Sequence, residues 1–309
     1  MKLKKNIIAI RIKSLGLGNI FFQYATAKSL AIKKNAEVVL DISGLKMGAQ
    51  MPYSDISAQV RDILELIEPF NMTYKFIEKN KIFSLRGLPY SNNKVLRKLG
   101  SLLTKLEMRP KTYVIEKEIH QFQDLAQNTD SMYLDGTFIN PNYFLNNKKD
   151  ILKDFSCSRK LPDIFCDLQA QIRLENSISI HIRRGDYLST QVDNVYVTHD
   201  IDYVENSIKV MESIVGIGKY YIFSDDIDWV KSNMPCTIDA TYVSSLGTSP
   251  WMDLELMSLC HHNIICNSTF SWWGAFRNKN PEKIVICPKA WRNDNIDISN
   301  MILDDWIAI

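Results

Sequence analysis

Two adjacent arginines follow an apolar, strand-like run in the middle of the chain. Residues 177–187 read SISIHIRRGDY. Side chains along a strand alternate between its two faces, so Arg183 projects to the same side as His181 and Arg184 to the other. A guanidinium group is costly to bury without an anion, so we expect either internal ion pairs or an anionic ligand here. If a ligand binds, one arginine contacts it and the other pairs with an internal partner such as Asp186 or a neighbouring acid.

The planar fork of donors on an arginine suits a diphosphate better than the single charge of a lysine does. Gly185 lets the backbone turn sharply after the strand. Residues 184–186 also spell Arg-Gly-Asp, a cell-adhesion motif, but adhesion needs an exposed loop tip and this motif adjoins a strand. The residues therefore favour a diphosphate site, with a buried network of ion pairs as the alternative.

Two carboxylates end a second apolar run, in the stretch YYIFSDDIDWV (220–230). Asp225 and Asp226 come at the carboxyl end of the expected strand, where open α/β sheets bind ligands. One hypothesis is that a carboxylate there accepts two hydrogen bonds from the edge of a guanine base. The alternative is that Ser224 or Asp225 caps the helix that follows. Asp226 and Asp228 also match the D-x-D of metal-dependent sugar transferases. Because Asp228 falls inside the expected helix, we expect no metal site.

Hydroxyl side chains open a helix after a third apolar run, in IICNSTFSWWGAF (264–276). Hydroxyls and free backbone N–H groups at a helix N-terminus form a phosphate site. The candidate residues are Asn267, Ser268, Thr269, Phe270 and Ser271. Trp272 and Trp273 either fill the core or stack on a base.

A glycine-containing loop, LGLGN (15–19), follows the first strand-like run of the chain. Gly16, Gly18 and Asn19 invite a dinucleotide-binding interpretation, since Asp41 ends the next strand. However, the G-x-G-x-x-G pattern puts Phe21 where helix–strand packing needs a small residue. This weakens the oxidoreductase hypothesis.

The pattern of strands and helices around these residues predicts an α/β fold with two doubly wound parallel sheets. The start of the chain predicts a β-α-β unit, with strands at 6–12 and 36–42 and a helix at 20–34. In the second half, strand-like runs alternate with helical segments, the pattern of a parallel sheet. Its strands are expected at 178–183, 219–224, 240–243, 263–266 and 284–287, and its helices near 200–215, 226–233, 250–261 and 270–279. A polar joint at 150–162 separates domains 1–155 and 156–309, whose facing sheet ends would hold a ligand in the cleft.

Composition narrows the class of protein. The chain has 309 residues, 46% hydrophobic residues and a net charge of +2, so nothing global indicates nucleic acid binding. Its six cysteines show no C-x-x-C and read as reduced thiols of a cytoplasmic protein. No apolar run reaches the ~18 residues of a spanning helix.

One amphipathic helix is expected at 93–107, where leucines share a face and lysines share another. Its basic side suits attraction to an anionic membrane surface. The alternative is a helix packed on its own domain with a solvated basic face, and we favour that alternative.

Five motifs together resemble the bacterial α-1,2-fucosyltransferases, glycosyltransferase family eleven. They are HIRRGDY (181–187), FSDD (223–226), NSTFSWWGA (267–275), YLDG (133–136) and GLGN with FQYA (16–25). The family pattern continues Gly-Asn with Gln-Met-Phe, whereas Asn19 is followed here by Ile20 and Phe21. The ligand contact of that glutamine is therefore not carried over.

The resemblance implies a GT-B-like fold and inverting, metal-independent transfer of L-fucose from GDP-L-fucose, a co-substrate, with no cofactor. Arg183 would hold the diphosphate with Ser268, Thr269 and Ser271. His181 and Asp226 would lie near the nucleoside, and Asp186 is the nearest carboxylate for a general base. The remaining substrate-binding residues carried over are Gly16, Gly18, Asn19, Arg184, Asp225, Asn267 and Phe270.

The resemblance also assigns the partners. Domain 1–155 would take the acceptor, a galactose-terminated oligosaccharide or lipid-linked glycan attacked through its 2-hydroxyl, and domain 156–309 would bind GDP-fucose. The resemblance implies a role in surface-polysaccharide (O-antigen) synthesis. The protein would act in the cytoplasm, with peripheral contact at the inner membrane face. The rival hypotheses are a non-catalytic nucleotide-binding module and an NAD-dependent oxidoreductase.

Overall fold

The computed structural model describes residues 5–43, 45–47, 51–52, 56–87, 94–105, 108, 110–126, 129–185, 195–197, 199, 201–234, 238–294 and 296–309. The chain folds as two compact units, Met1–Phe155 and Ser156–Ile309. Asp186, one of the residues proposed above, lies outside the described residues.

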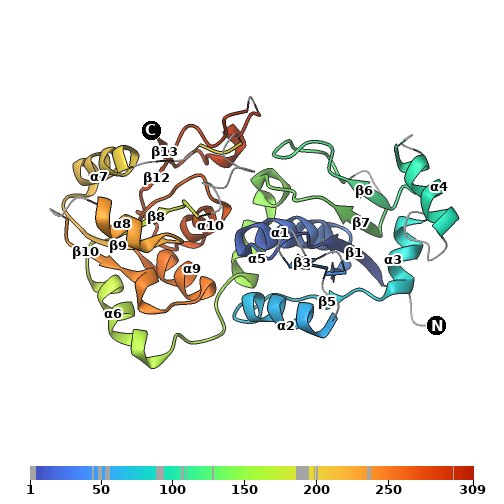
Figure 1. The fold of residues 1–309 in the computed structure, drawn as a ribbon, viewed down its shortest axis with the longest axis horizontal. Coiled ribbons are helices and arrows are strands. Elements are labelled where there is room, and N and C mark those ends of the chain that lie inside the picture. Colours follow the sequence, from blue (N-terminus) through green and yellow to red (C-terminus); the bar gives the residue numbers. More distant parts are fainter. Residues whose placement is uncertain are drawn as a thin grey trace. The chain divides into compact units, whose positions relative to one another are not determined.

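The first unit is built on a parallel sheet with the strand order β5-β2-β1-β7-β6 (Figure 1). Its central strand is almost wholly apolar, as expected for a strand covered on both faces. The strands are β1 (Asn6–Arg11), β2 (Ala36–Asp41), β5 (Lys75–Phe76), β6 (Tyr113–Ile115) and β7 (Met132–Asp135). A separate antiparallel pair joins β3 (Lys46–Met47) and β4 (Met51–Pro52).

The long helix α1 (Leu17–Lys33) connects β1 to β2, so the expected β-α-β unit is confirmed. Its interior is aromatic: Phe21 is fully buried and its ring stacks on Phe155 with centroids 3.9 Å apart. The Tyr24 hydroxyl donates to Asp154 at 2.6 Å, which ties α5 (Lys148–Asp154) to α1. The remaining helices of this unit are α2 (Ile56–Ile67), α3 (Lys79–Arg86) and α4 (Lys94–Lys105).

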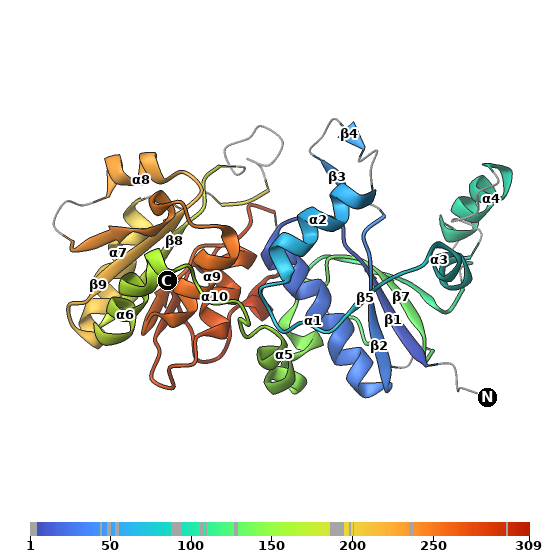
Figure 2. The ribbon, with the colours of Figure 1, turned by 90° about the horizontal axis from the view of Figure 1, so that it is seen from below.

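The second unit is also parallel, with the order β10-β9-β8-β11-β12-β13. Numbered from its own first strand this order is 3-2-1-4-5-6, that of the Rossmann fold. The strands are β8 (Ser177–Ile182), β9 (Lys219–Ser224), β10 (Ala240–Tyr242), β11 (His262–Ile264), β12 (Val285–Cys287) and β13 (Ile307–Ala308). The helices are α6 (Cys166–Leu174), α7 (Ile201–Val215), α8 (Ile227–Asn233), α9 (Pro250–Leu259) and α10 (Thr269–Arg277) (Figure 2).

The core of this unit lies between the sheet and its helices. Every residue of β8 is buried, and its isoleucines pack with those of β9, β11 and β12. Trp272 and Trp273 are fully buried, and the Trp272 indole donates to the Met301 carbonyl at 2.7 Å. The tryptophans therefore fill the core, and the base-stacking alternative is wrong. Short 3-10 helices cover Pro141–Tyr143, Leu145–Asn147, Asp163–Phe165, Val243–Leu246 and Ser299–Met301.

The two Rossmann-like parallel sheets confirm the predicted α/β fold class. Helix α1 begins at Leu17 rather than at residue 20, and β13 was not among the strands expected. Within the described part of the chain, no helix combines the length and apolar character needed to span a membrane.

Candidate active site at the carboxyl edge of the second sheet

The strand order of the second unit directs attention to one place. A Rossmann-type sheet changes winding direction between its first and fourth strands, here β8 and β11, and ligands bind beyond the carboxyl ends of these strands. The arginine motif follows β8, Asp225 follows the neighbouring β9, and the segment 265–271 follows β11. The three motifs singled out in the second half of the sequence thus lie at one edge.

Arg183 and Asp225 form the central contact of this edge. The Arg183 Nε lies 3.1 Å from Asp225 Oδ2, and the two side chains are 32% and 24% exposed. Asp225 also accepts backbone hydrogen bonds from Arg184, at 2.9 Å, and Gly185, at 3.1 Å. One carboxylate therefore orients the arginine and fixes the turn after β8.

Gly185 is needed for space at this turn. A Cβ atom on Gly185 would lie 2.7 Å from Asp225 Oδ2, closer than real Cβ contacts come. Since three donors hold that carboxylate, it cannot move aside without loss of hydrogen bonds. The glycine of the motif thus permits the close approach of Asp225 to the backbone.

Arg184 has a different environment. Its Nε lies 3.4 Å from Asp226 Oδ2, and its guanidinium carbon lies 3.3 Å from the ring centroid of Trp229. The arginine side chain is 13% exposed. Arg184 therefore pairs with a neighbouring acid, as predicted for one of the two arginines, and the indole face adds a cation–π contact.

Asp226 rather than Ser224 or Asp225 caps the helix after β9. Its side chain accepts from the Trp229 N–H at 3.4 Å, and Ser224 Oγ accepts from the Asp226 N–H at 3.0 Å. The sequence-based alternative that named Ser224 or Asp225 as the cap is wrong by one or two residues. Asp228 lies in the first turn of α8, as expected from the sequence.

His181 is buried beneath this edge. Its Nδ1 lies 3.1 Å from Cys266 Sγ, and its ring centroid lies 5.5 Å from that of Phe270. Burial, together with the positive charge of Arg183, lowers the pKa of His181 to about 3. The imidazole is thus neutral at physiological pH and adds no positive charge for a diphosphate.

The N-terminus of α10 completes the edge. Ser268 is the N-cap, and its Oγ accepts from the Phe270 N–H at 3.3 Å. Ser271 is fully buried and donates to the Ser268 carbonyl at 3.3 Å, so its hydroxyl shapes the turn. Thr269 is half-buried at the first helical position. The first-turn N–H groups form a local positive end beside His181.

Asn267 has a supporting place in this segment. It is 3% exposed, and its side-chain amide donates to the carbonyls of Val197 at 2.7 Å and Trp291 at 2.8 Å. It thereby ties two loops to the start of α10. Its amide N–H groups are occupied inside the protein, so its position favours a structural contribution to the site.

The glycine-rich loop lies in the first unit, at the carboxyl end of β1. Gly16 is the N-cap of α1, with no side-chain cap, and Gly18 and Asn19 belong to the first helical turn. The stretch is therefore a helix N-terminus rather than the loop expected from the sequence. A Cβ atom on Gly16 would meet only the Asn19 side chain and Ser14, at ordinary contact distances of 3.7 Å and more.

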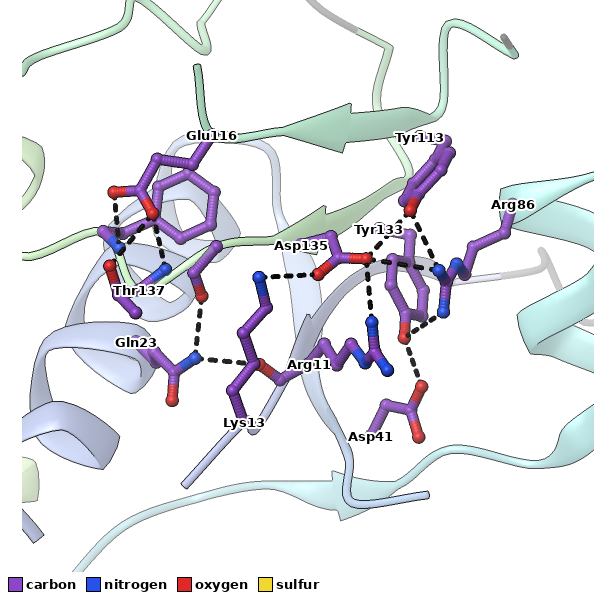
Figure 3. Close-up of polar contacts among 12 residues, drawn as sticks. Arg11, Lys13, Gln23, Asp41, Arg86, Tyr113, Glu116, Tyr133, Asp135 and Thr137 are labelled. Carbon is purple, nitrogen blue, oxygen red and sulfur yellow. Dashed lines mark hydrogen bonds and ion pairs between the residues drawn. The ribbon is translucent and has the colours of Figure 1, made fainter. Parts of the chain in front are cut away.

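A second polar cluster, not predicted from the sequence, lies at the carboxyl edge of the first sheet (Figure 3). Asp135, at the end of β7, accepts from Arg86 Nη2 at 3.2 Å and the Tyr113 hydroxyl at 2.8 Å. Arg11 Nη1 and Lys13 Nζ approach the same carboxylate, at 3.3 Å and 3.1 Å.

Burial raises the pKa of Asp135, but the charges of Arg11 and Lys13 and the Tyr113 hydrogen bond outweigh it and hold the pKa below its usual range. Gln23 joins the ends of β1 and β7, because its Nε2 donates to the carbonyls of Arg11 at 2.8 Å and Gly136 at 2.7 Å. The YLDG motif hinted at Asp135, but its cationic partners are too far apart in the sequence to be found by pattern.

Trp229 and Cys266 are the residues of the second edge that sequence reasoning missed. Trp229 lies one helical turn after Asp226. The sequence signal for its contact with Arg184 was a basic residue at one strand end and an aromatic residue at the start of the helix after the next strand. The sequence marked Cys266 only as one of six reduced thiols. Burial raises its pKa to about 12, so it remains a neutral partner of His181.

The fold consists of two Rossmann-like units, each with polar residues gathered at the carboxyl edge of its parallel sheet. The chain belongs to glycosyl transferase family 11, whose pattern matches residues 12–309.

Two curated relatives from Escherichia coli match nearly end to end. The chain is similar to the O-antigen biosynthesis glycosyltransferase WbnK, at 30% identity over 95% of this chain and 98% of the relative. It is also similar to an α-1,2-colitosyltransferase, at 26% identity over 98% of this chain and 99% of the relative. Among solved structures, fucosyltransferase NodZ from Bradyrhizobium matches with a TM-score of 0.46 and 14% identity, over 88% of this chain and 92% of that chain.

Proposed function

We propose that the chain transfers L-fucose from GDP-L-fucose to the 2-hydroxyl of a terminal galactose, with inversion and without a metal ion. The observation that carries this proposal is the half-exposed Arg183–Asp225 pair at the winding-reversal point of the second sheet, beside the N-terminus of α10. Membership of family 11 and the sequence similarity to two glycosyltransferases support it.

Arg183 is the proposed diphosphate ligand. Asp225 contacts its Nε and orients the guanidinium, and the Arg183 side chain is still 32% exposed at this edge, where a phosphate could reach it. The pair orients the arginine before the donor binds, so less side-chain entropy is lost on binding. This is a change from the expectation of an arginine with no internal partner: the ligand would share Arg183 with Asp225.

The chemistry requires stabilisation of a leaving group. The fucosyl C1–oxygen bond breaks with the electron pair going to the β-phosphate, and the acceptor oxygen forms the new bond on the opposite face of the sugar. Negative charge grows on GDP as the bond breaks, and donors already aimed at that charge lower the barrier. Arg183 and the first-turn N–H groups of α10, near Ser268 and Thr269, are the proposed donors.

Other positions follow from the same proposal. His181 and Asp226 lie near the nucleoside in this proposal, with Asp226 held by Arg184 and the start of α8. The proton of the acceptor hydroxyl goes to a general base, for which we retain Asp186. The first unit, with Gly16, Gly18 and Asn19, is proposed to receive the acceptor.

The setting we propose is O-antigen or related surface-polysaccharide synthesis in the cytoplasm. WbnK is named for O-antigen biosynthesis, and this supports a glycan acceptor. The second relative is named for transfer of colitose in an α-1,2 linkage. A nucleotide-activated colitose is therefore the competing donor that any assay has to include.

Mass spectrometry of the products tests this function. The protein is incubated with GDP-L-fucose and methyl β-galactoside, and with the 2-deoxy form of that galactoside as the matched control. We expect one deoxyhexose to be added to the first acceptor and none to the second. Intact GDP-fucose with every acceptor would favour a non-catalytic binding module, and preference for activated colitose would overturn the choice of donor.

A parallel arm with excess EDTA tests the metal-free mechanism. We expect the same product yield, because Arg183 and α10 supply the positive charge at the leaving group. Loss of product that Mn²⁺ restores would contradict this and return attention to Asp226 and Asp228 as metal ligands.

A further inference from the structure

Helix α4 carries an apolar stripe that faces solvent. Val95, Leu99 and Leu102 are spaced by four and three residues, so they share one side of the helix. They are 74%, 45% and 54% exposed. The sequence favoured a helix packed on its own domain with a solvated basic face. These three side chains are not covered by the domain, whereas Gly100, on another side of α4, is buried and Leu103 is half-buried.

The exposed apolar area extends beyond this stripe. Leu96 in α4 is 40% exposed, and Met108, just after the helix, is 66% exposed. The neighbouring helix α3 lies beside α4 in both views (Figures 1 and 2) and adds Phe83, which is 46% exposed. Exposed apolar side chains gathered on neighbouring helices mark an interaction site more often than scattered single residues do.

Positive charge flanks the apolar stripe. Lys94 and Lys98 are exposed, lie one helical turn apart, and precede Val95 and Leu99 by one position each. Lys81 of α3 is also exposed. The sequence adds Arg97 and Lys105 to α4, and the helix contains no acidic residue.

We propose that α4 attaches the protein to the surface of an anionic lipid bilayer. A helix with an apolar stripe and flanking lysines lies in the interface, with its leucines among the acyl chains and its ammonium groups at the lipid phosphates. A second copy of the chain fits less well, because two such helices would bring their lysine rows together without an opposing charge. This inference stands independently of the transferase function.

The test is flotation with lipid vesicles. Vesicles of equal parts phosphatidylglycerol and phosphatidylcholine are compared with pure phosphatidylcholine, at low salt and at high salt. We expect the protein to float with the anionic vesicles at low salt, and high salt to weaken binding by screening. Each lysine near an anionic surface contributes roughly fivefold in partitioning, so Lys94→Glu with Lys98→Glu should lose at least about 25-fold.

Two matched controls separate binding through α4 from a general effect of surface charge or surface hydrophobicity. Lys149→Glu with Lys153→Glu reverses two exposed lysines of α5 that are also one turn apart, and should leave binding unchanged. Leu99→Asp should abolish binding, whereas Ile217→Asp, at an 86% exposed position of the second unit, should not.

Three results would overturn the proposal. One is equal binding of the wild type to neutral and anionic vesicles, and another is equal loss in the controls. The third is a dimer, measured by light scattering without lipid, that Leu99→Asp converts to monomer, since that would make a second copy the occupant of the stripe. Circular dichroism of each variant shows that the fold is retained.

Discussion

Both units place arginine–aspartate contacts at the carboxyl edge of a parallel sheet, but the two edges differ in exposure. In the first unit, Arg86 and Asp135 are each 7% exposed. In the second, Arg183 and Asp225 are 32% and 24% exposed. The Arg86–Asp135 pair is thus buried in the first unit, although Arg11, which also reaches Asp135, is 29% exposed, whereas the Arg183–Asp225 pair is open to solvent in the second.

The partners of the carboxylates differ in the same way. Asp135 collects three cations and a tyrosine hydroxyl, so its hydrogen-bonding capacity is used by the protein itself. Asp225 holds one arginine side chain and two backbone N–H groups. A sealed network stabilises a fold, whereas an oriented and exposed arginine remains accessible to an anion. Burial and partner number, rather than residue type, separate a structural pair from a candidate ligand site.

The largest expected effect comes from breaking the sealed network. Asp135→Ala leaves Arg86 buried without its carboxylate, and removing one partner of a buried pair costs about 3–5 kcal/mol. Asp225→Ala should cost only about 1 kcal/mol, because its partners reach water. Urea denaturation of both variants measures the difference. Equal losses would mean that exposure does not separate the two edges.

A second effect concerns pH. In the folded protein the pKa of His181 is about 3, while an unfolded histidine has its usual value near 6.5. The unfolded state therefore binds the proton first as pH falls, so stability is greatest above pH 6.5 and declines between that pH and 3. The decline from pH 6.5 to 5 is about 2 kcal/mol at about 1.4 kcal/mol per pH unit.

His181→Gln should remove this contribution from the slope of unfolding free energy against pH. Urea titrations at several pH values measure the two slopes. The comparison is between slopes, so any uniform loss of stability in the variant does not affect it. Identical slopes for wild type and variant would show that His181 becomes protonated within the folded protein.

The smallest effect tests the Arg184–Trp229 contact. A double-mutant cycle with Arg184→Met and Trp229→Leu isolates the pair, and a cation–π contact at a mostly buried site is worth about 1–2 kcal/mol. Unfolding free energies of the four proteins give the coupling. A coupling energy near zero would mean that Arg184 contributes to stability through its ion pair with Asp226 and not through Trp229.

Much of the fold could be predicted because buried parallel strands read as continuous apolar runs. β9 follows this pattern, whereas β8 alternates isoleucine with serine or histidine, which also marks a strand. The helices between the strands have recognisable starts. β5 and β13 are two residues long, too short for any periodicity to appear. Their strand character comes from pairing with β2 and β12, which is information outside the local sequence.

The location of the candidate residues at strand ends could be predicted, but their pairing could not. Motif spacing put Arg183, Asp225 and Ser268 at strand ends, and the strand order brings those ends together. Which acid meets which arginine depends on the register of β8 and β9, where Ile182 lies opposite Ser224. The Asp135 cluster depends wholly on contacts between distant residues, so no local pattern reveals it.

The central claim is that the exposed arginine of the second unit, and not that of the first, binds the diphosphate. Arg11 offers a matched control, because it is 29% exposed beside Asp135, close to the 32% of Arg183 beside Asp225. Both are changed to lysine, which keeps the charge and removes the fork.

Isothermal titration calorimetry with GDP decides the claim most directly, because it needs neither acceptor nor turnover. We expect Arg183→Lys to weaken GDP binding by tenfold or more, since charge-assisted hydrogen bonds of about 1.5–3 kcal/mol are lost, and Arg11→Lys to bind as the wild type does. Wild-type affinity in Arg183→Lys, or an equal loss in Arg11→Lys, would contradict the account.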